Sequence, residues 1–212
     1  MNVILVTEQF EQKRKNMETC TIIFVAFASG IVYASFFEWN LHKFIMHRNM
    51  SWLRYPYEKH TLTHHRIFKS DDTYHLQDDS HRKTIPMAWW NCVLLIPLAT
   101  LPSLVPAVVF GHLISIPLSV FVAISLYYAT YEYMHWCMHL PLQKRRLVEK
   151  MPAVGWIFYR LNGHHLLHHR YMGKNFNVVL PLWDLLFGTL IVRSKIRFNQ
   201  ATGPCVPNVQ PV

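Results

Sequence analysis

The stretch TIIFVAFASGIVYASFF, residues 21–37, contains no charged residue and is followed directly by EWNLHKFIMH, residues 38–47. A helix that crosses a bilayer needs roughly 20 mainly apolar residues. We therefore predict a membrane-spanning helix here. Its end leads straight into a segment that carries two histidines, His42 and His47.

A second apolar region extends from Pro86 to Met134 and is long enough for two further spans, joined by a tight turn near FGH, residues 110–112. The stretch VVLPLWDLLFGTLIV, residues 178–192, is interrupted by a proline, an aspartate and a glycine, which indicates an interfacial or re-entrant segment. The predicted fold class is all-α: an integral membrane helical bundle of about three spans with a cytosolic histidine-rich helical cap.

The composition fits one domain that lies partly in a membrane. The chain has 212 residues, of which 51% are hydrophobic, and a formal net charge of +9. Its basic residues lie beside long apolar stretches, which favours a membrane surface over nucleic acid as the partner. Four cysteines without a CxxC pair indicate reduced thiols, with neither a disulfide framework nor a zinc ribbon. We expect an N-terminal tail (1–19), a membrane-embedded catalytic domain (20–200) and a flexible C-terminal tail (201–212).

The basic residues also predict an orientation. Apart from three in the N-terminal tail, they lie between or after the spans and away from the turn at 110–112. The positive-inside rule then places the histidine-bearing regions in the cytosol and the N-terminus outside. The expected location is the endoplasmic reticulum in a eukaryote or the inner membrane in a bacterium.

Four histidine clusters carry the chemistry. They read HKFIMH (42–47), HTLTHH (60–65), HWCMH (135–139) and HHLLHH (164–169). Imidazole is a ligand for iron, zinc, copper and nickel, whereas magnesium and calcium require oxygen ligands. So many imidazoles at chelating spacings predict a transition-metal site.

The spacings predict two metals. On an α-helix, residues four apart share a face, while adjacent residues diverge by about 100°. In the second and fourth clusters, histidines four apart are expected to share one metal while the adjacent histidine points towards another. His135 and His139 form another such pair. His42 and His47 are five apart, so either they serve different metals or the helix ends there.

Other polar residues have several possible roles. The outer nitrogens of the ligands, or the metal charge, can be matched by nearby acids: Glu38, Glu132, Asp78, Asp79 or Asp184. His112 is predicted to be an ordinary interfacial residue, and the roles of His75 and His81 stay open. The basic clusters HRK (81–83) and KRR (144–146) are read as anchors to anionic lipid, with docking of a redox partner as the alternative.

The order HX4H, HX3HH, HX3H and HX2HH, followed by NFNVVLPLWDLLFGT (175–189), resembles the fatty acid hydroxylase and sterol desaturase superfamily over residues 38–189. The resemblance implies two iron ions, which zinc can replace on purification, and leaves His164 as a spare. NFN replaces the family's usual Asn-aromatic-Gly, and EWNLHKFIMH also resembles beta-carotene hydroxylases. The ligands implied are His42, His47, His60, His64, His65, His135, His139, His165, His168 and His169.

The resemblance also implies an activity: a non-haem di-iron monooxygenase that uses O2 to hydroxylate a C–H bond of a fatty acyl, sterol or carotenoid lipid from the bilayer. Electrons must come from a donor such as cytochrome b5 or ferredoxin, because the chain has no G-x-G-x-x-G fingerprint. Desaturation at the same site is the first alternative. A histidine-rich metal-handling membrane protein is the second, although the predicted spans lack the ionisable residues that ion passage requires.

Overall fold

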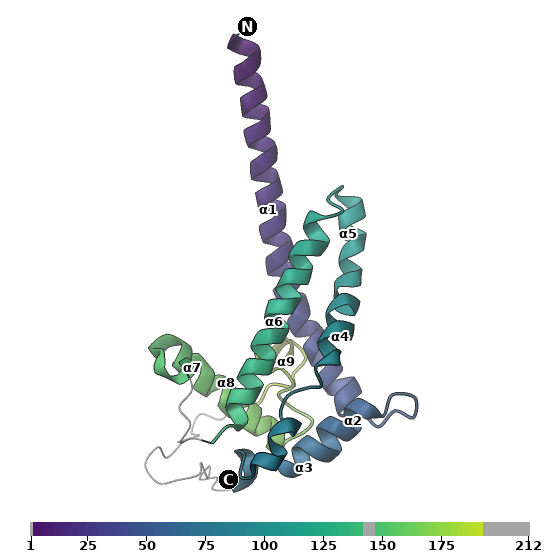
Figure 1. The fold of residues 1–212 in the computed structure, drawn as a ribbon, viewed down its shortest axis with the longest axis vertical. Helices are drawn as coiled ribbons and strands as arrows, with labels where there is room; N and C mark the ends of the chain where they lie inside the picture. Colours follow the sequence, from purple (N-terminus) through teal and green to yellow (C-terminus); the bar gives the residue numbers. More distant parts are fainter. Residues whose placement is uncertain (1, 142–146, 193–212) are drawn as a thin grey trace. The chain divides into compact units, whose positions relative to one another are not determined.

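The computed structural model describes residues 2–141 and 147–192, which form helices and connecting loops with no strand among them (Figure 1). The chain divides into two compact units: Met1–Ala34 with Trp89–Tyr128, and Ser35–Ala88 with Ala129–Val212. The long helices α1 (Asn2–Asn40) and α6 (Ser115–His139) contribute to both units.

The first unit contains a helical hairpin. Helix α4 (Trp90–Thr100) continues through the 3₁₀ turn η5 (Leu101–Ser103) into α5 (Leu104–Val109), and α6 returns after the turn. A proline in η5 lacks the amide hydrogen that an α-helix requires, which accounts for the local change in winding. Gly111 has a φ of 71° in the turn, so the structure places a tight turn at the predicted FGH segment.

Helices α1 and α6 cross closely within this unit. A Cβ atom at Gly30 would lie 2.8 Å from the Cβ of Ala123 and 3.3 Å from the Cα of Val120. A glycine is therefore required at this crossing, because any side chain would push the two backbones apart.

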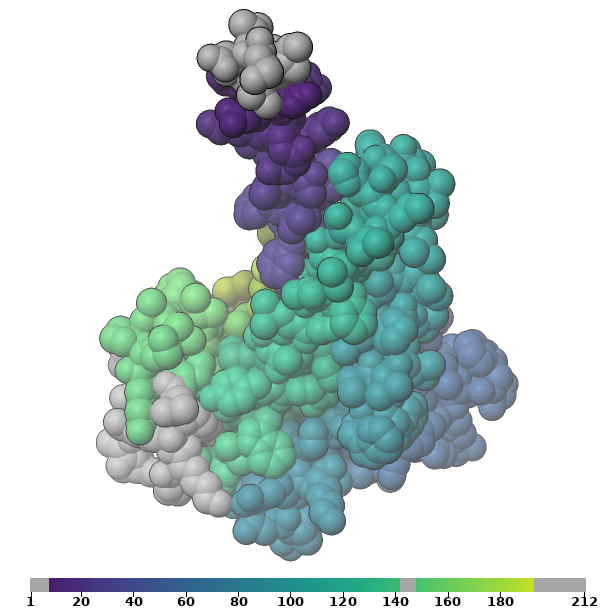
Figure 2. All heavy atoms as spheres, turned by 45° about the horizontal axis from the view of Figure 1, so that its top comes forward, coloured from purple at the N-terminus to yellow at the C-terminus, as the bar shows by residue number. Residues whose placement is uncertain are grey.

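Two helical segments are long and apolar enough to cross a membrane: Glu8–Met46 and Trp90–Val109. Only 22% and 17% of their apolar windows are buried inside the protein, whereas the core helix of a soluble protein is mostly buried. Figure 2 shows the side chains of α4 and α5 (teal) at the surface. The exposed apolar residues of this part of the chain include Val93, Val105, Val108 and Phe110. A surface of this kind suits lipid.

These two segments test only part of the membrane topology that the sequence predicts. Helix α6 has 25 residues but is not one of the two, so a third span stays a prediction. Helix α9 (Leu182–Leu186) has five residues and is too short to cross. Most of the expected N-terminal tail is part of helix α1, which begins at Asn2. The expected C-terminal tail (201–212) and the basic cluster KRR (144–146) lie outside the described residues.

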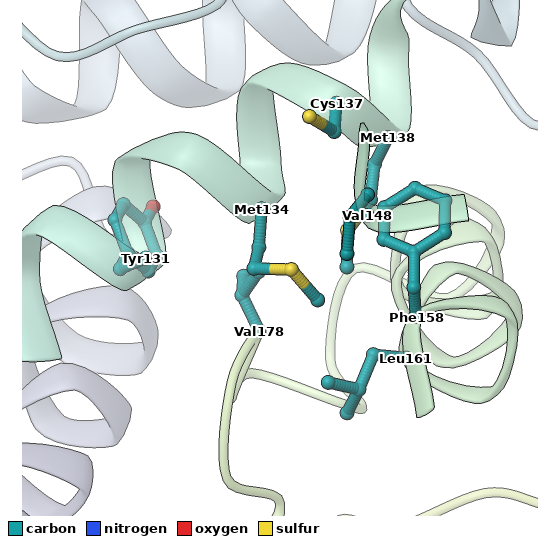
Figure 3. Close-up of a cluster of buried hydrophobic side chains, with 8 residues drawn as sticks. All are labelled: Tyr131, Met134, Cys137, Met138, Val148, Phe158, Leu161 and Val178. Carbon is teal, nitrogen blue, oxygen red and sulfur yellow. The ribbon is translucent and has the colours of Figure 1, made fainter. Parts of the chain in front are cut away.

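The second unit holds the four histidine clusters, two on short helical segments and two on longer helices. Its elements are the end of α1, η1 (Leu41–Met46), α2 (Tyr55–Lys59), η2 (His60–His64), α3 (His65–Ile67), η3 (Asp72–Tyr74), η4 (Asp79–Thr84), the end of α6, α7 (Leu147–Lys150), α8 (Pro152–Arg170) and α9. Figure 3 shows the apolar core between α6 and α8, in which Met134 and Met138 face Phe158, Leu161 and Val178. This core fixes the two helices that carry the third and fourth histidine clusters.

Candidate metal centre

The second unit brings the ten histidines together in two groups. Within each group the candidate ligand nitrogens all lie within 4.8 Å of one another. Group A consists of His42, His47, His60, His65 and His168. Group B consists of His64, His135, His139, His165 and His169.

The regular helices α6 and α8 place their histidines as the spacing predicts. His135 and His139, four apart on α6, both belong to group B, as do His165 and His169 on α8. His168 is adjacent to His169 and belongs to group A. A single helix therefore supplies both groups, because adjacent side chains diverge by about 100°.

The first two clusters differ from the prediction because both lie on π-helical segments. The amide of His47 donates to the carbonyl oxygen of His42 at 3.1 Å, and the amide of His65 donates to that of His60. In a π-helix, residues five apart lie one turn apart. His60 thus shares group A with His65, and the predicted pairing of His60 with His64 is wrong. The open question about His42 and His47 is answered in the same way: both belong to group A.

Three outer nitrogens of group A are held by one short segment and one hydroxyl. Nδ1 of His42 donates to the carbonyl oxygen of Phe176, and Nδ1 of His168 donates to that of Lys174 at 2.8 Å. Nδ1 of His47 donates to Oγ1 of Thr61 at 3.2 Å. The hydroxyl of Thr61 donates its own proton to the carbonyl oxygen of Met46 at 2.7 Å, so it accepts from His47.

Three outer nitrogens of group B use a different stretch of chain, residues 68–84. Nδ1 of His139 donates to the carbonyl oxygen of Tyr74 at 2.8 Å, and Nδ1 of His64 donates to that of Thr84 at 3.2 Å. Nδ1 of His169 donates to the carbonyl oxygen of Phe68. The polar loop between the second histidine cluster and α4 is therefore part of the support for the site.

These bonds fix the tautomers and leave the inner nitrogens as lone pairs. Nε2 of His47 and Nε2 of His168 lie 3.1 Å apart, although each ring already uses its only proton at Nδ1. Two facing lone pairs repel one another unless a cation lies between them. In group B, Nε2 of His64 and both ring nitrogens of His135 are buried without a hydrogen-bond partner. The donor set fits a metal ion in each group.

Burial keeps the rings neutral. It lowers the pKa of His64 and of His168 to about 4, so both rings are unprotonated at neutral pH. Burial, reinforced by the neighbouring imidazoles, also lowers the pKa of other members of both groups: His60, His65, His165 and His169. A neutral imidazole is the form that binds a metal.

The other singled-out residues lie outside the two groups. His164 is buried, and its Nε2 lies 3.3 Å from Oδ2 of Asp184. His75 is buried against the ring of Tyr74, while His81 is exposed. His112 lies at the turn between α5 and α6, in the unit without the metal groups.

The acids also differ in position. Asp78 caps η4 by accepting from the amide of Ser80, and Asp79 pairs with Arg82 at the surface. Asp184 is fully buried. Burial raises its pKa, but hydrogen bonds from His164, Thr189 and two backbone amides outweigh this effect and hold the pKa below its ordinary value. Asp184 is therefore a carboxylate inside the protein.

Sequence reasoning missed the partners of the outer nitrogens. Most of them are main-chain carbonyls, which side-chain identity does not reveal. The one signal was the run NFNVVLPLWDLLFGT (175–189), because an aspartate and two asparagines in an apolar stretch are expected to be hydrogen-bonded if buried. Asn175, Asn177 and Asp184 are indeed fully buried.

Comparisons with known proteins agree with this geometry. The family model for fatty acid hydroxylases matches residues 27–189, a range that contains both histidine groups. A dihydroceramide fatty acyl 2-hydroxylase of Arabidopsis thaliana is 28% identical over 175 residues, which cover 81% of this chain and 62% of that protein. The chain thus spans less than two thirds of the length of this curated relative. No solved structure matches. The histidine clusters and the family match lead to one conclusion: the chain belongs to the fatty acid hydroxylase family.

Proposed function

We propose that this chain is a membrane-bound lipid hydroxylase with a dinuclear metal centre, in which group A and group B each hold one ion. The observation that carries the proposal is the pair of five-histidine groups, in which six of the ten rings have their outer nitrogen tied to a fixed oxygen and their inner lone pair facing inward. Metal-ligating histidines typically donate their other ring N–H to such oxygens.

Iron is the metal we propose, on the strength of the family and of the all-imidazole donor set. When bound, the two irons supply O2 activation and the oxidation of an unactivated C–H bond. The overall reaction places one oxygen atom on the lipid and releases the other as water, which requires two electrons and two protons from outside.

The residues of the chain contribute position and exclusion of water. All five members of group B are buried, and the apolar core beside them includes Tyr131, whose ring stacks on that of His135 with centroids 5.7 Å apart. Dry, rigid surroundings of this kind keep the ligands at fixed positions and prevent loss of oxidising power to water. We propose a fatty acyl chain as the substrate, in line with the name of the relative.

The electrons come from a separate redox protein such as cytochrome b5 or ferredoxin. Basic residues flank ligands of both groups directly in the sequence: Arg48 follows His47, Arg66 follows His65 and Arg170 follows His169. All three arginines are exposed. A positive surface steers an acidic partner towards the centre.

The proposed topology places the histidine unit in the cytosol. With three spans, a reporter fused after Val212 is expected in the cytosol and one placed before Met1 outside. Protease protection of tagged membranes measures this directly. If both tags report the same side, the number of spans is even and the proposed topology is wrong.

Lipid analysis with labelled oxygen tests the activity. Membranes that contain the chain, a donor system and ¹⁸O2 are expected to form an alcohol on an acyl lipid that carries one ¹⁸O atom. A new double bond without label would instead indicate desaturation. An unchanged lipid pool in the presence of bound metal would favour metal handling. The matched control is the same membrane with His168→Ala, which removes a ligand of group A.

A further inference from the structure

We propose that Asp184 is a positioning residue for group A, and that it acts through the main chain of residues 174–177 while group B is supported independently. This inference rests on the proposed dinuclear centre and adds a residue that contacts none of the ten histidines. Two carbonyl oxygens of this segment, those of Phe176 and Lys174, orient His42 and His168.

The carboxylate of Asp184 holds this segment at two consecutive amides. Oδ1 accepts from the amide of Phe176 at 2.9 Å, and Oδ2 accepts from the amide of Asn177 at 2.8 Å. The hydroxyl of Thr189 donates to Oδ1 at 2.6 Å, and His164 lies on the other side. Because the amides of Phe176 and Asn177 point towards Asp184, the carbonyl oxygen of Phe176 points away from Asp184 and faces His42.

The neighbouring asparagine adds to the rigidity of the segment. Asn175 has a φ of 56°, a left-handed conformation that a side chain of this kind tolerates better than most. Its amide group donates to the carbonyl oxygens of His164 and Ile191, both at 3.1 Å, and its Oδ1 accepts from the amide of Ile191 at 2.6 Å. His164, the histidine outside both groups, is thus part of the support for this segment.

An asparagine cannot replace the carboxylate here. A carboxylate accepts on both oxygens, whereas an amide side chain accepts on one oxygen and presents an NH2 group on the other side. In Asp184→Asn, either the amide of Phe176 or that of Asn177 therefore meets a second donor. The segment must shift, and with it the oxygens that orient His42 and His168.

Cobalt(II) titration of the purified chain tests the inference, since the ion gives a visible absorption that reports its ligand environment. We expect the wild type to bind two ions and Asp184→Asn to lose roughly 10- to 100-fold in affinity for one of them, the range seen when partners of metal ligands are removed. Thr189→Val, a milder change, is expected to weaken the same ion by a smaller factor.

Two backgrounds identify the ion that is affected. In His169→Ala, which impairs group B, adding Asp184→Asn should weaken the remaining ion strongly. In His168→Ala, which impairs group A, the same addition should leave the remaining ion unchanged. If Asp184→Asn weakened metal binding equally in both backgrounds, the cause would be a general loss of folding. The same equal weakening by Thr189→Val would overturn the inference.

Ser35→Ala is the matched control. Its hydroxyl is buried and donates to the carbonyl oxygen of Leu180 at 2.7 Å. The carbonyl oxygen of Ser35 accepts from Nδ2 of Asn177 at 2.9 Å, and the substitution leaves that bond in place. This variant should bind both ions as the wild type does. If the wild type binds no ion, the proposed function fails. If the wild type binds two and both Asp184→Asn and Thr189→Val bind them equally well, only the role of Asp184 is refuted.

Discussion

Group A and group B contain the same number of histidines but are built differently. Four of the five histidines of group A lie in or directly after π-helical segments, and four of the five histidines of group B lie on the regular helices α6 and α8. Three outer nitrogens of group A face residues 174–176 and Thr61, while three of group B face residues 68–84.

The two groups are therefore supported by different parts of the chain. Groups that share one helix, α8, nevertheless depend on different oxygens: those of Lys174, Phe176 and Thr61 for group A, and those of Phe68, Tyr74 and Thr84 for group B. Burial differs as well, since His47 of group A is partly exposed and every member of group B is buried. The difference implies that each ion can be removed without the other.

The largest effect is expected from the adjacent histidines of α8. His168→Ala and His169→Ala should each lower hydroxylation more than about 100-fold, because both ions are needed, yet each should lose the ion of its own group. Metal analysis of the two purified variants, together with turnover, measures this. If both ions leave in both variants, the groups form one inseparable site and the comparison fails.

A change of pH should affect both groups in the same window. The pKa of His168 in group A and of His64 in group B is lowered to about 4 from an ordinary value of 6.5. Between these values the unfolded chain binds more protons than the folded one, so the metal-free fold loses stability as the pH falls from 6.5 towards 4. Protons compete with a bound metal only near the lower value.

We therefore expect the bound metal to be retained from pH 7 to about 5 and to be released as the pH approaches 4. Dialysis across this range, followed by metal analysis, measures the release. A midpoint near 6.5 would contradict the burial argument, and release of one ion well before the other would show that the groups differ in proton affinity as well as in support.

A smaller effect, confined to group A, is expected from Thr61→Val. This change removes the acceptor for Nδ1 of His47 and should weaken one ion roughly 10-fold. Thr63→Val is the control, because the hydroxyl of Thr63 makes a similar bond, to the carbonyl oxygen of Glu58, on the same short helical stretch. Equal metal affinity in both variants would show that the orientation of His47 does not depend on this hydroxyl.

The comparison also explains which features could be predicted from the sequence. The apolar run at 21–37 and the turn at 110–112 follow from composition and glycine chemistry, and the structure has a helix and a turn there. The pairs His135 with His139 and His165 with His169 follow from the α-helical period. These features depend on local rules that hold along a single helix.

The remaining features depend on the fold as a whole. The pairing of His60 with His65 requires a π-helix, whose occurrence is not encoded in a local period and is set by packing. The carbonyl oxygens of Tyr74 and Phe176 become partners of ligands only when distant segments meet. Three buried polar side chains, those of Asn175, Asn177 and Asp184, were the only sequence trace of the Phe176 segment.

The smallest effect is expected from two aromatic rings that cover the groups. The ring of Phe176 lies 5.7 Å from that of His42 in group A, and the ring of Phe68 lies 4.6 Å from that of His139 in group B. Both residues also supply a carbonyl oxygen to a ligand, and a substitution leaves that oxygen in place. Phe176→Leu and Phe68→Leu should therefore bind both ions.

Each ring contact is worth about 0.5–1.5 kcal/mol, so we expect a few-fold change in turnover and a slightly lower melting temperature in both variants. Metal content and thermal unfolding of the matched pair separate the ring from the carbonyl oxygen. Loss of an ion from Phe176→Leu alone would mean that the ring, and not the main chain, positions group A. The independent support of the two groups would then have to be explained by side-chain packing.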